Sequence, residues 1–276
     1  MKLLAQIKFS LYFSVLIAAS TFAQSTPENK YFDSAGVRIR YIELGSGEPV
    51  IALHGLTRNS DTWLEKISGL AENHRLILFD QRGHGLSDKP HTVAEYGREM
   101  GHDVIRLMDH LNIPKAHILG YSLGVAPIGM VITENESRFI SAIFGAGAAS
   151  WEWGDTSDLV NQQIYQRVVN SPRQQQLVGS MKGQDQIALA SLRLGEKLLL
   201  VSKQSLSNLS IPIMAIVGSE DSVLETVQSF KNTFPAIELV VVEGETHLSL
   251  PADPEFLESI QDFLSRNQGN LKPEGN

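Results

Sequence analysis

The residues of this chain best suited to chemistry are Gly120-Tyr121-Ser122-Leu123-Gly124, in which two glycines flank a short stretch containing a serine. The apolar run 116–119 precedes them and a segment with helical spacing follows, so Ser122 lies at an expected strand-to-helix turn. Such a turn is a nucleophile elbow, which lifts a serine hydroxyl into a cleft. The glycines fit because a Cβ at either position would crowd the adjoining helix and strand. The alternative is a small-residue turn between two core elements.

Two further side chains favour the elbow. Asp221 follows the apolar run 213–217, and His247 is the one histidine that follows the last apolar run, 238–242. The carboxyl ends of parallel strands share one edge of a sheet, so these residues and Ser122 are expected to meet. His247 would take the serine proton and return it to the leaving group, while Asp221 would fix the imidazole tautomer. Glu220 is the competing acid; Asp221 is favoured because it lies one residue further from the strand and has a shorter side chain.

Backbone donors are expected beside the serine. The run 49–53 ends in His54-Gly55-Leu56, and the N–H groups of Leu56 and Leu123 are the candidates for an oxyanion hole. Only the backbone is needed for this, so the His54 side chain is interpreted as a structural group that closes a turn.

Other polar clusters are interpreted as structural. Asp80 and Arg82 are expected to brace the loop after the run 75–79, where glycines already account for the turn that contains His84. The pairs at 102–103 and 109–110 lack the spacing of a His-x-x-x-His metal site and are interpreted as a solvated helix face. Trp151 and Trp153 are expected either to line a substrate pocket or to anchor a lid.

The elements that must position these residues alternate along the chain. A hairpin over 30–32 and 37–42 and six apolar runs predict eight strands; the six runs are 49–53, 75–79, 116–119, 139–144, 213–217 and 238–242. Segments with helical spacing lie between them, at 62–72, 93–111, 123–134, 223–234 and 254–267. This order predicts an α/β fold with an eight-stranded, mostly parallel sheet and helices on both faces.

One interval interrupts the alternation. Residues 150–210 contain no convincing strand, while 162–169 and 187–200 are amphipathic, which predicts a helical cap inserted after the sixth strand. The alternative is that these are extra core helices. The core domain is then expected over 24–149 and 211–267, followed by a flexible tail at 268–276.

The first residues indicate export. Lys2 and Lys8 precede an apolar run at 9–19, and Thr21-Phe22-Ala23 has the small residues of a cleavage site, so 1–23 is predicted to be a signal peptide. An uncleaved anchor is the alternative, but the run is short for a membrane span. We expect a secreted or periplasmic protein with no stable membrane span after cleavage.

Composition excludes several classes of protein. The formal net charge is −8 and no arginine-rich run occurs, so nucleic acid is not an expected partner. The chain has no cysteine, which excludes disulfides and a lipid-bearing cysteine. Neither a dinucleotide-binding loop nor a GxxxxGK[ST] phosphate loop is present.

These motifs together resemble the α/β-hydrolase family. The resemblance rests on HGL at 54–56, DQRGHGLSDKP at 80–90, GYSLG at 120–124, GSED at 218–221 and the histidine at 247. It is strongest to the branch of serine esterases and cofactor-free haloperoxidases with a helical cap. The resemblance implies a triad of Ser122, Asp221 and His247, with Leu56 and Leu123 at the oxyanion hole. The family's dehalogenases and epoxide hydrolases use an aspartate nucleophile, so Ser122 argues against both activities, and Val125 replaces a glycine common in relatives.

The resulting expectation is a serine hydrolase that cleaves carboxylic esters of small or medium-sized substrates through an acyl-enzyme on Ser122 and needs no cofactor or metal. The same triad would also suit a carbon–carbon bond, lactone or amide hydrolase, or a perhydrolase. A protein of this fold that only binds a small ligand is the non-enzymatic alternative.

Overall fold

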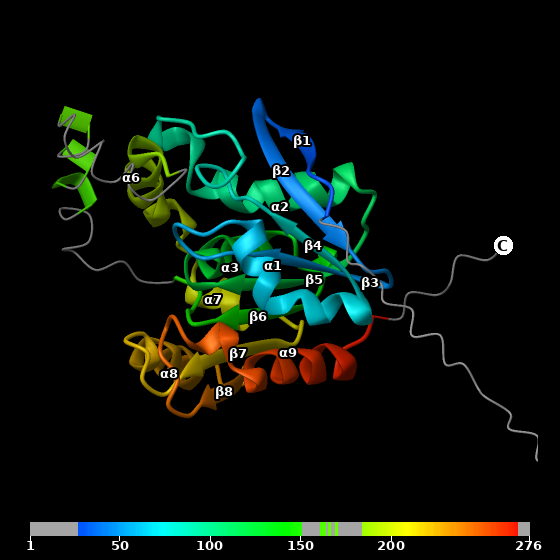
Figure 1. The fold of residues 1–276 in the computed structure, drawn as a ribbon. Helices are drawn as coiled ribbons and strands as arrows, with labels where there is room; N and C mark the ends of the chain where they lie inside the picture. The colour runs from blue at the N-terminus through cyan, green and yellow to red at the C-terminus, as the bar shows by residue number, and fades with distance from the viewer. Residues whose placement is uncertain (1–26, 151–160, 164, 167–168, 171–183, 270–276) are drawn as a thin grey trace, which may run out of the picture.

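The fold is built around one eight-stranded sheet. A computed structural model describes residues 27–150, 161–163, 165–166, 169–170 and 184–269. The strands lie in the order β1-β2-β4-β3-β5-β6-β7-β8 (Figure 1). Their bounds are β1 Lys30–Ser34, β2 Val37–Leu44, β3 Glu48–Leu53, β4 His74–Phe79, β5 Ala116–Tyr121, β6 Phe139–Gly145, β7 Ile213–Gly218 and β8 Glu238–Val242.

Strand β2 alone runs against its neighbours. It pairs antiparallel with β1 and β4, whereas β4, β3, β5, β6, β7 and β8 pair in parallel. The predicted eight-stranded, mostly parallel sheet is therefore confirmed. The carboxyl ends of β3 to β8 all lie at one edge, which is where loops of distant sequence can meet.

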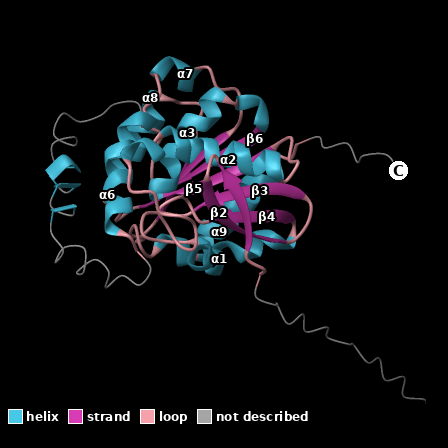
Figure 2. Cartoon of the chain, turned by 90° about the horizontal axis from the view of Figure 1, so that it is seen from above, coloured by secondary structure: helices cyan, strands magenta, loops and turns pink. Residues whose placement is uncertain are grey.

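Helices cover both faces of the sheet (Figure 2). One face packs against α2 Arg98–His110, α3 Val125–Glu134 and α8 Leu224–Thr233, and the other against α1 Ser60–Ile67 and α9 Pro254–Arg266. Each face of the sheet forms a hydrophobic core with its helices, because successive side chains of a strand point to opposite faces. In β3, Ile51 and Leu53 face the first layer of helices, and Val50 and Ala52 face the second. All four are fully buried.

The helix expected over 93–111 is interrupted. A 3₁₀ turn occupies Val93–Glu95, and α2 begins only after Gly97, whose φ is +63°. A Cβ on Gly97 would stand 2.6 Å from the carbonyl oxygen of Gly195, so the chain needs glycine where the insertion approaches this turn. Other 3₁₀ segments are Ser68–Glu72, Ser122–Gly124, Glu136–Arg138, Glu196–Leu199 and Leu250–Ala252.

The insertion after β6 is described in part. Its helices include α6 Gln186–Gly195 and the short α7 Lys203–Ser207, and 161–163, 165–166 and 169–170 are helical. Trp151 and Trp153 lie outside the described residues, as do the predicted signal peptide and most of the tail. The cap as a separate unit, with its boundaries, stays a prediction. No helix in the described ranges is long and apolar enough to cross a membrane.

Candidate active site

Ser122 lies on a strained turn between β5 and α3. Its φ is +54°, in the left-handed region that side chains rarely adopt. The glycines on either side allow close packing: a Cβ on Gly120 would stand 2.5 Å from the carbonyl oxygen of Gly124, and one on Gly124 would stand 2.7 Å from that of Leu53. The local geometry is that of a nucleophile elbow, in which the strand, the turn and the helix leave no room for larger residues.

Ser122, His247 and Asp221 form one hydrogen-bonded chain. His247 Nε2 lies 2.9 Å from Ser122 Oγ, and its Nδ1 lies 2.9 Å from Asp221 Oδ2. A carboxylate only accepts, so Nδ1 carries the proton and Nε2 is free to accept from the serine hydroxyl. The structure thus brings together the three residues that the sequence placed after β5, β7 and β8.

Asp221, rather than Glu220, faces the imidazole. The Asp221 side chain is fully buried, and its second oxygen accepts the N–H of Val223 at 3.0 Å. Glu220 is exposed, although its backbone N–H donates to the carbonyl of Glu245 in the loop that leads to His247. Two bonds orient the Asp221 carboxylate, which in turn orients the ring.

Tyr121 supplies a contact that the sequence did not reveal. Its hydroxyl donates a 2.7 Å hydrogen bond to the backbone carbonyl of His247, and the two rings lie 5.6 Å apart. Burial, and to a lesser degree the charge of Asp221, raises the pKa of Tyr121, so the hydroxyl remains a donor. One feature of the sequence does indicate where the Tyr121 side chain lies. Residues two apart in a strand face the same side of the sheet, so Tyr121 faces the layer of α1 and α9 together with Leu119.

The candidate oxyanion donors lie on two segments that meet at Ser122. A Cβ on Gly55 would stand 3.4 Å from Ser122 Cβ, so the loop carrying Leu56 passes directly against the nucleophile. The Leu56 N–H has no acceptor among the described residues, and Leu123 directly follows the serine. Leu123 belongs to a buried apolar cluster with Ala188 and Leu192 of α6, and Leu56 packs against that cluster, so the described part of the insertion covers this side of the site.

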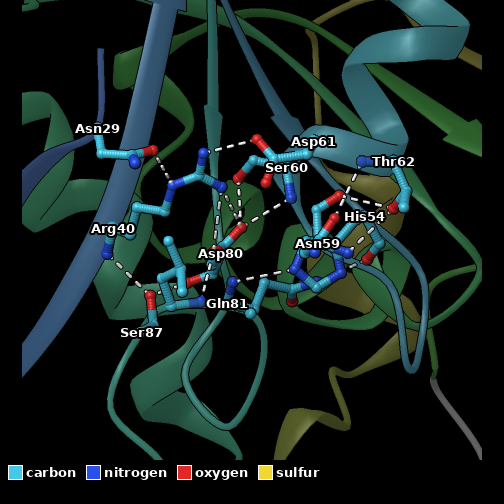
Figure 3. Close-up of polar contacts among 12 residues, drawn as sticks. Asn29, Arg40, His54, Asn59, Ser60, Asp61, Thr62, Asp80, Gln81 and Ser87 are labelled. Carbon is cyan, nitrogen blue, oxygen red and sulfur yellow. Dashed lines mark hydrogen bonds and ion pairs between the residues drawn. The ribbon is translucent and has the colours of Figure 1, made fainter. Parts of the chain in front are cut away.

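A buried carboxylate fixes the loop that carries Leu56 (Figure 3). Asp80 Oδ1 accepts the backbone N–H and the hydroxyl of Ser60 at 2.7 and 2.6 Å, and Oδ2 accepts the N–H of Leu86 at 2.7 Å. Arg40 lies 3.3 Å from Asp80 and extends the network to Asp61 at 2.6 Å. Burial opposes the charged form, but the neighbouring His54 and these hydrogen bonds lower the pKa of Asp80. The predicted bracing by Asp80 therefore reaches the start of α1.

His54 is the structural group expected from the sequence. Its Nε2 accepts the N–H of Gln81 at 3.1 Å, its Nδ1 lies 2.8 Å from the carbonyl of Gly55, and Gln81 donates back to the His54 carbonyl at 2.6 Å (Figure 3). His84 stacks edge-on against it, with ring centroids 5.0 Å apart. Burial lowers the pKa of His54 and lowers that of His84 to about 3, so both rings are neutral at pH 7. Among the described residues, neither imidazole forms a hydrogen bond with Ser122 or Asp221.

The interpretation of Asp103 as part of a solvated face is wrong. Asp103 is completely buried and binds the guanidinium of Arg82 with both oxygens, at 2.6 and 2.8 Å. It also accepts a hydrogen bond from Ser34 on β1. The pair thus ties the loop after β4 to α2, which is the bracing expected of Arg82 with a partner that was not foreseen.

A cavity of about 590 Å³ opens beside Ser122 and His247. Its other lining residues come from the loop after β3, from α1, from the end of β5 and from the segment after His247, and they include Arg58, Trp63, Lys66 and Leu248. Gln184, at the start of the described insertion, donates to the carbonyl of Thr57 at 2.9 Å and so supports the same loop. Neither Arg58 nor Lys66 was singled out by the sequence, because an isolated surface cation carries no local signal. In the described ranges, no group of three or more His, Asp and Glu side chains has the arrangement of metal ligands.

Comparison with known proteins finds the same fold. Residues 48–167 match the family model described as alpha/beta hydrolase fold. A thermophilic esterase from Thermogutta terrifontis superposes with a TM-score of 0.76 at 19% identity, over 89% of this chain and all of the esterase. The resemblance in fold expected from the motifs is therefore confirmed.

Sequence relatives differ in their activities. Haloalkane dehalogenase 2 of Mycobacterium tuberculosis is 29% identical over 150 residues, which are 52% of this chain and 49% of the dehalogenase. A protein of Synechocystis sp. that is named as a non-heme chloroperoxidase is 23% identical over 227 residues, covering 80% of this chain and 82% of the relative. The chain thus spans about half the length of the dehalogenase that it matches.

Proposed function

We propose that this chain, which has the α/β-hydrolase fold, is a serine hydrolase that cleaves carboxylic esters of small or medium-sized substrates. The observation that carries the proposal is the chain of two 2.9 Å hydrogen bonds from Ser122 through His247 to Asp221 at the rim of the cavity. A serine hydroxyl is a weak nucleophile until a base accepts its proton, and this arrangement supplies that base.

The reaction follows from the placement of each group. As Ser122 Oγ attacks the ester carbonyl carbon, its proton passes to His247 Nε2, and Asp221 stabilises the resulting imidazolium. The N–H groups of Leu56 and Leu123 would hold the negative oxygen of the tetrahedral intermediate. The imidazolium then protonates the departing alcohol, which leaves an acyl group on Ser122. A water molecule, activated by His247, attacks this acyl-enzyme in the same way and releases the acid. The original serine proton leaves with the alcohol, and a proton from water restores the serine hydroxyl, so the triad is regenerated and no cofactor is required.

Serine at this position favours acyl transfer over dehalogenation. Displacement of a halide by a carboxylate nucleophile gives an ester, which water can hydrolyse. Displacement by Ser122 would instead give an ether, which this site has no means to open. The similarity to haloalkane dehalogenase 2 therefore supports the fold but not that reaction.

Replacement of Ser122 tests the proposal. Ser122→Ala should abolish turnover of p-nitrophenyl acetate and labelling by a fluorophosphonate, a loss of at least about 10³-fold in kcat. Ser137→Ala is the matched control, because Ser137 is exposed and precedes β6 at the opposite edge of the sheet. Full retention of turnover and labelling in Ser122→Ala would contradict the assignment.

The rival functions use the same cavity and differ in measurable ways. A substrate screen of the purified protein would reveal hydrolysis of a carbon–carbon bond, a lactone or an amide, and would also reveal perhydrolysis. A protein that only binds a ligand would combine ligand-induced thermal stabilisation with slow single turnover.

Export is proposed from the sequence of residues 1–23 alone. Mass spectrometry of the protein from a periplasmic or culture fraction should give Gln24 as its first residue. An intact Met1 in that fraction would contradict cleavage.

A further inference from the structure

We infer that the substrates of this site carry a carboxylate, which Arg58 and Lys66 bind in the cavity beside Ser122. The inference rests on the proposed hydrolase function and names its substrate class. The ester carbonyl would lie at Ser122 and Leu56, and the carboxylate would extend toward the two cations. The cavity, at about 590 Å³, is of the size that small-molecule sites have in proteins.

The charges of the cavity wall differ from those of the whole chain. The formal net charge of the chain is −8, yet the described lining residues include two cations, Arg58 and Lys66, and one carboxylate, Glu65. Within the described part of the chain, neither cation forms a salt bridge or a side-chain hydrogen bond, whereas many of the other arginines are paired with acids. Two unpaired cations in one cavity favour an anionic ligand.

Helix geometry places Lys66 nearer than Glu65 to the centre of the cavity wall that α1 forms. Successive residues of an α-helix are rotated by about 100°, so residues 62, 63 and 66 of α1 lie within roughly 100° of one another. Thr62, Trp63 and Lys66 all line the cavity, with Lys66 between the other two around the axis. Glu65 lies about 100° from Lys66 and therefore at the margin of this face. The wall that α1 presents is cationic at its centre.

Arg58 is held on the loop that carries the candidate oxyanion donor. Its backbone N–H donates to the Gly55 carbonyl at 3.2 Å, and Gln184 binds the carbonyl of Thr57 at 2.9 Å. Thr57 itself has a φ of +60°. These contacts fix the start of the Arg58 side chain two residues from Leu56, so the proposed carboxylate and oxyanion sites belong to one rigid turn.

Trp63 and Thr62 of α1 line the cavity without adding a free donor to it. Trp63 is buried, and its indole Nε1, which has no hydrogen-bond partner among the described residues, is buried with it. The hydroxyl of Thr62 is used at the helix cap with Asn59. The side chains of this wall that can bind an anion are therefore Arg58 and Lys66.

Matched pairs of esters test the inference. The monomethyl esters of glutarate, adipate and pimelate are compared with the neutral methyl esters in which an amide replaces the free carboxylate. For the chain length that fits, kcat/KM should favour the charged ester by about fivefold or more, and 0.5 M NaCl should reduce that ratio. Arg58→Gln and Lys66→Gln should each reduce the ratio toward one. Lys115→Gln, the same change at an exposed residue just before β5, should leave it intact.

Binding separates this inference from the proposed function. If no ester is turned over, the hydrolase proposal fails, and calorimetric titration with adipate and with adipamide still decides whether the anion site exists. Adipate should bind more tightly than adipamide, and Arg58→Gln should remove the difference. Equal binding of the two, or an ester preference unchanged in both Arg58→Gln and Lys66→Gln, would overturn the inference.

Discussion

The hydroxyl of Tyr121 donates a 2.7 Å hydrogen bond to the backbone carbonyl of His247, joining the residue before the nucleophile to the residue that would activate it. The two positions are 126 residues apart in sequence; Tyr121 is the last residue of β5, and His247 lies in the loop after β8. The bond therefore holds the distance between Ser122 and the imidazole without touching either reacting atom.

Removal of this hydroxyl should weaken catalysis more than folding. Tyr121→Phe keeps the ring packing but leaves the His247 carbonyl unpaired, and we expect a loss of about 1 kcal/mol in unfolding free energy and up to about tenfold in kcat. Tyr96→Phe is the matched control, because the hydroxyl of that buried tyrosine also donates to a carbonyl, that of Pro90, at 2.7 Å. It should lose stability while kcat stays near the parent value. Equal effects of both substitutions on kcat would argue against positioning by Tyr121.

The two adjacent acids after β7 should differ sharply. Asp221→Asn can still occupy the buried site, but its amide can donate to Nδ1 and so favour the wrong imidazole tautomer. A loss of about 10³- to 10⁴-fold in kcat is expected. Glu220→Gln changes an exposed side chain and should alter kcat by less than about twofold. Steady-state kinetics on p-nitrophenyl acetate measure both, and the reverse ranking would assign the wrong acid to the triad.

The glycine after the elbow should not tolerate even a methyl group. The Cβ of Gly124→Ala would stand 2.7 Å from the backbone oxygen of Leu53, which cannot move without shifting β3, and we expect a loss of about 1–3 kcal/mol in unfolding free energy. At Gly69 the nearest atom, at 2.9 Å, is the end of the flexible Leu257 side chain, so Gly69→Ala is the milder control. Denaturant unfolding compares the two. Similar stabilities would mean that the elbow backbone can relax.

Local patterns in the sequence were sufficient for the sheet and for the three candidate triad residues. Buried parallel strands are short apolar runs, and the residue types after each run can be listed without knowing their distances. Ser122, Asp221 and His247 each follow such a run, so the topology alone predicts that they meet. The helix α7 was missed because Lys203–Ser207 is largely polar and has no apolar stripe.

Contacts between distant polar residues were not predictable in the same way. Asp103 is followed by Val104 and preceded by His102, and nothing local indicates that its partner is Arg82 on another loop. Gly97 had the type expected of a helix break, but the need for it comes from Gly195, which lies nearly 100 residues away in sequence. The positions of Arg58 and Lys66 in the cavity wall were unpredictable for the same reason, because the cavity forms between segments whose arrangement only the fold determines.

Acid should destabilise the fold through the neutral histidines beneath the candidate oxyanion loop. Burial lowers the pKa of His84 from 6.5 to about 3, so between these values the unfolded chain binds a proton that the folded chain does not. Stability from this group is complete above pH 6.5 and is lost as the pH falls toward 3.

His84→Asn should reduce the slope of unfolding free energy against pH, measured by urea unfolding between pH 5 and 7, by roughly 1 kcal/mol per pH unit at its steepest. The variant and the parent are compared first at pH 8, where the histidine is neutral in both states, so that any loss of packing is measured separately. An unchanged slope would mean that His84 takes up its proton in the folded protein, most simply by breaking its contact with His54.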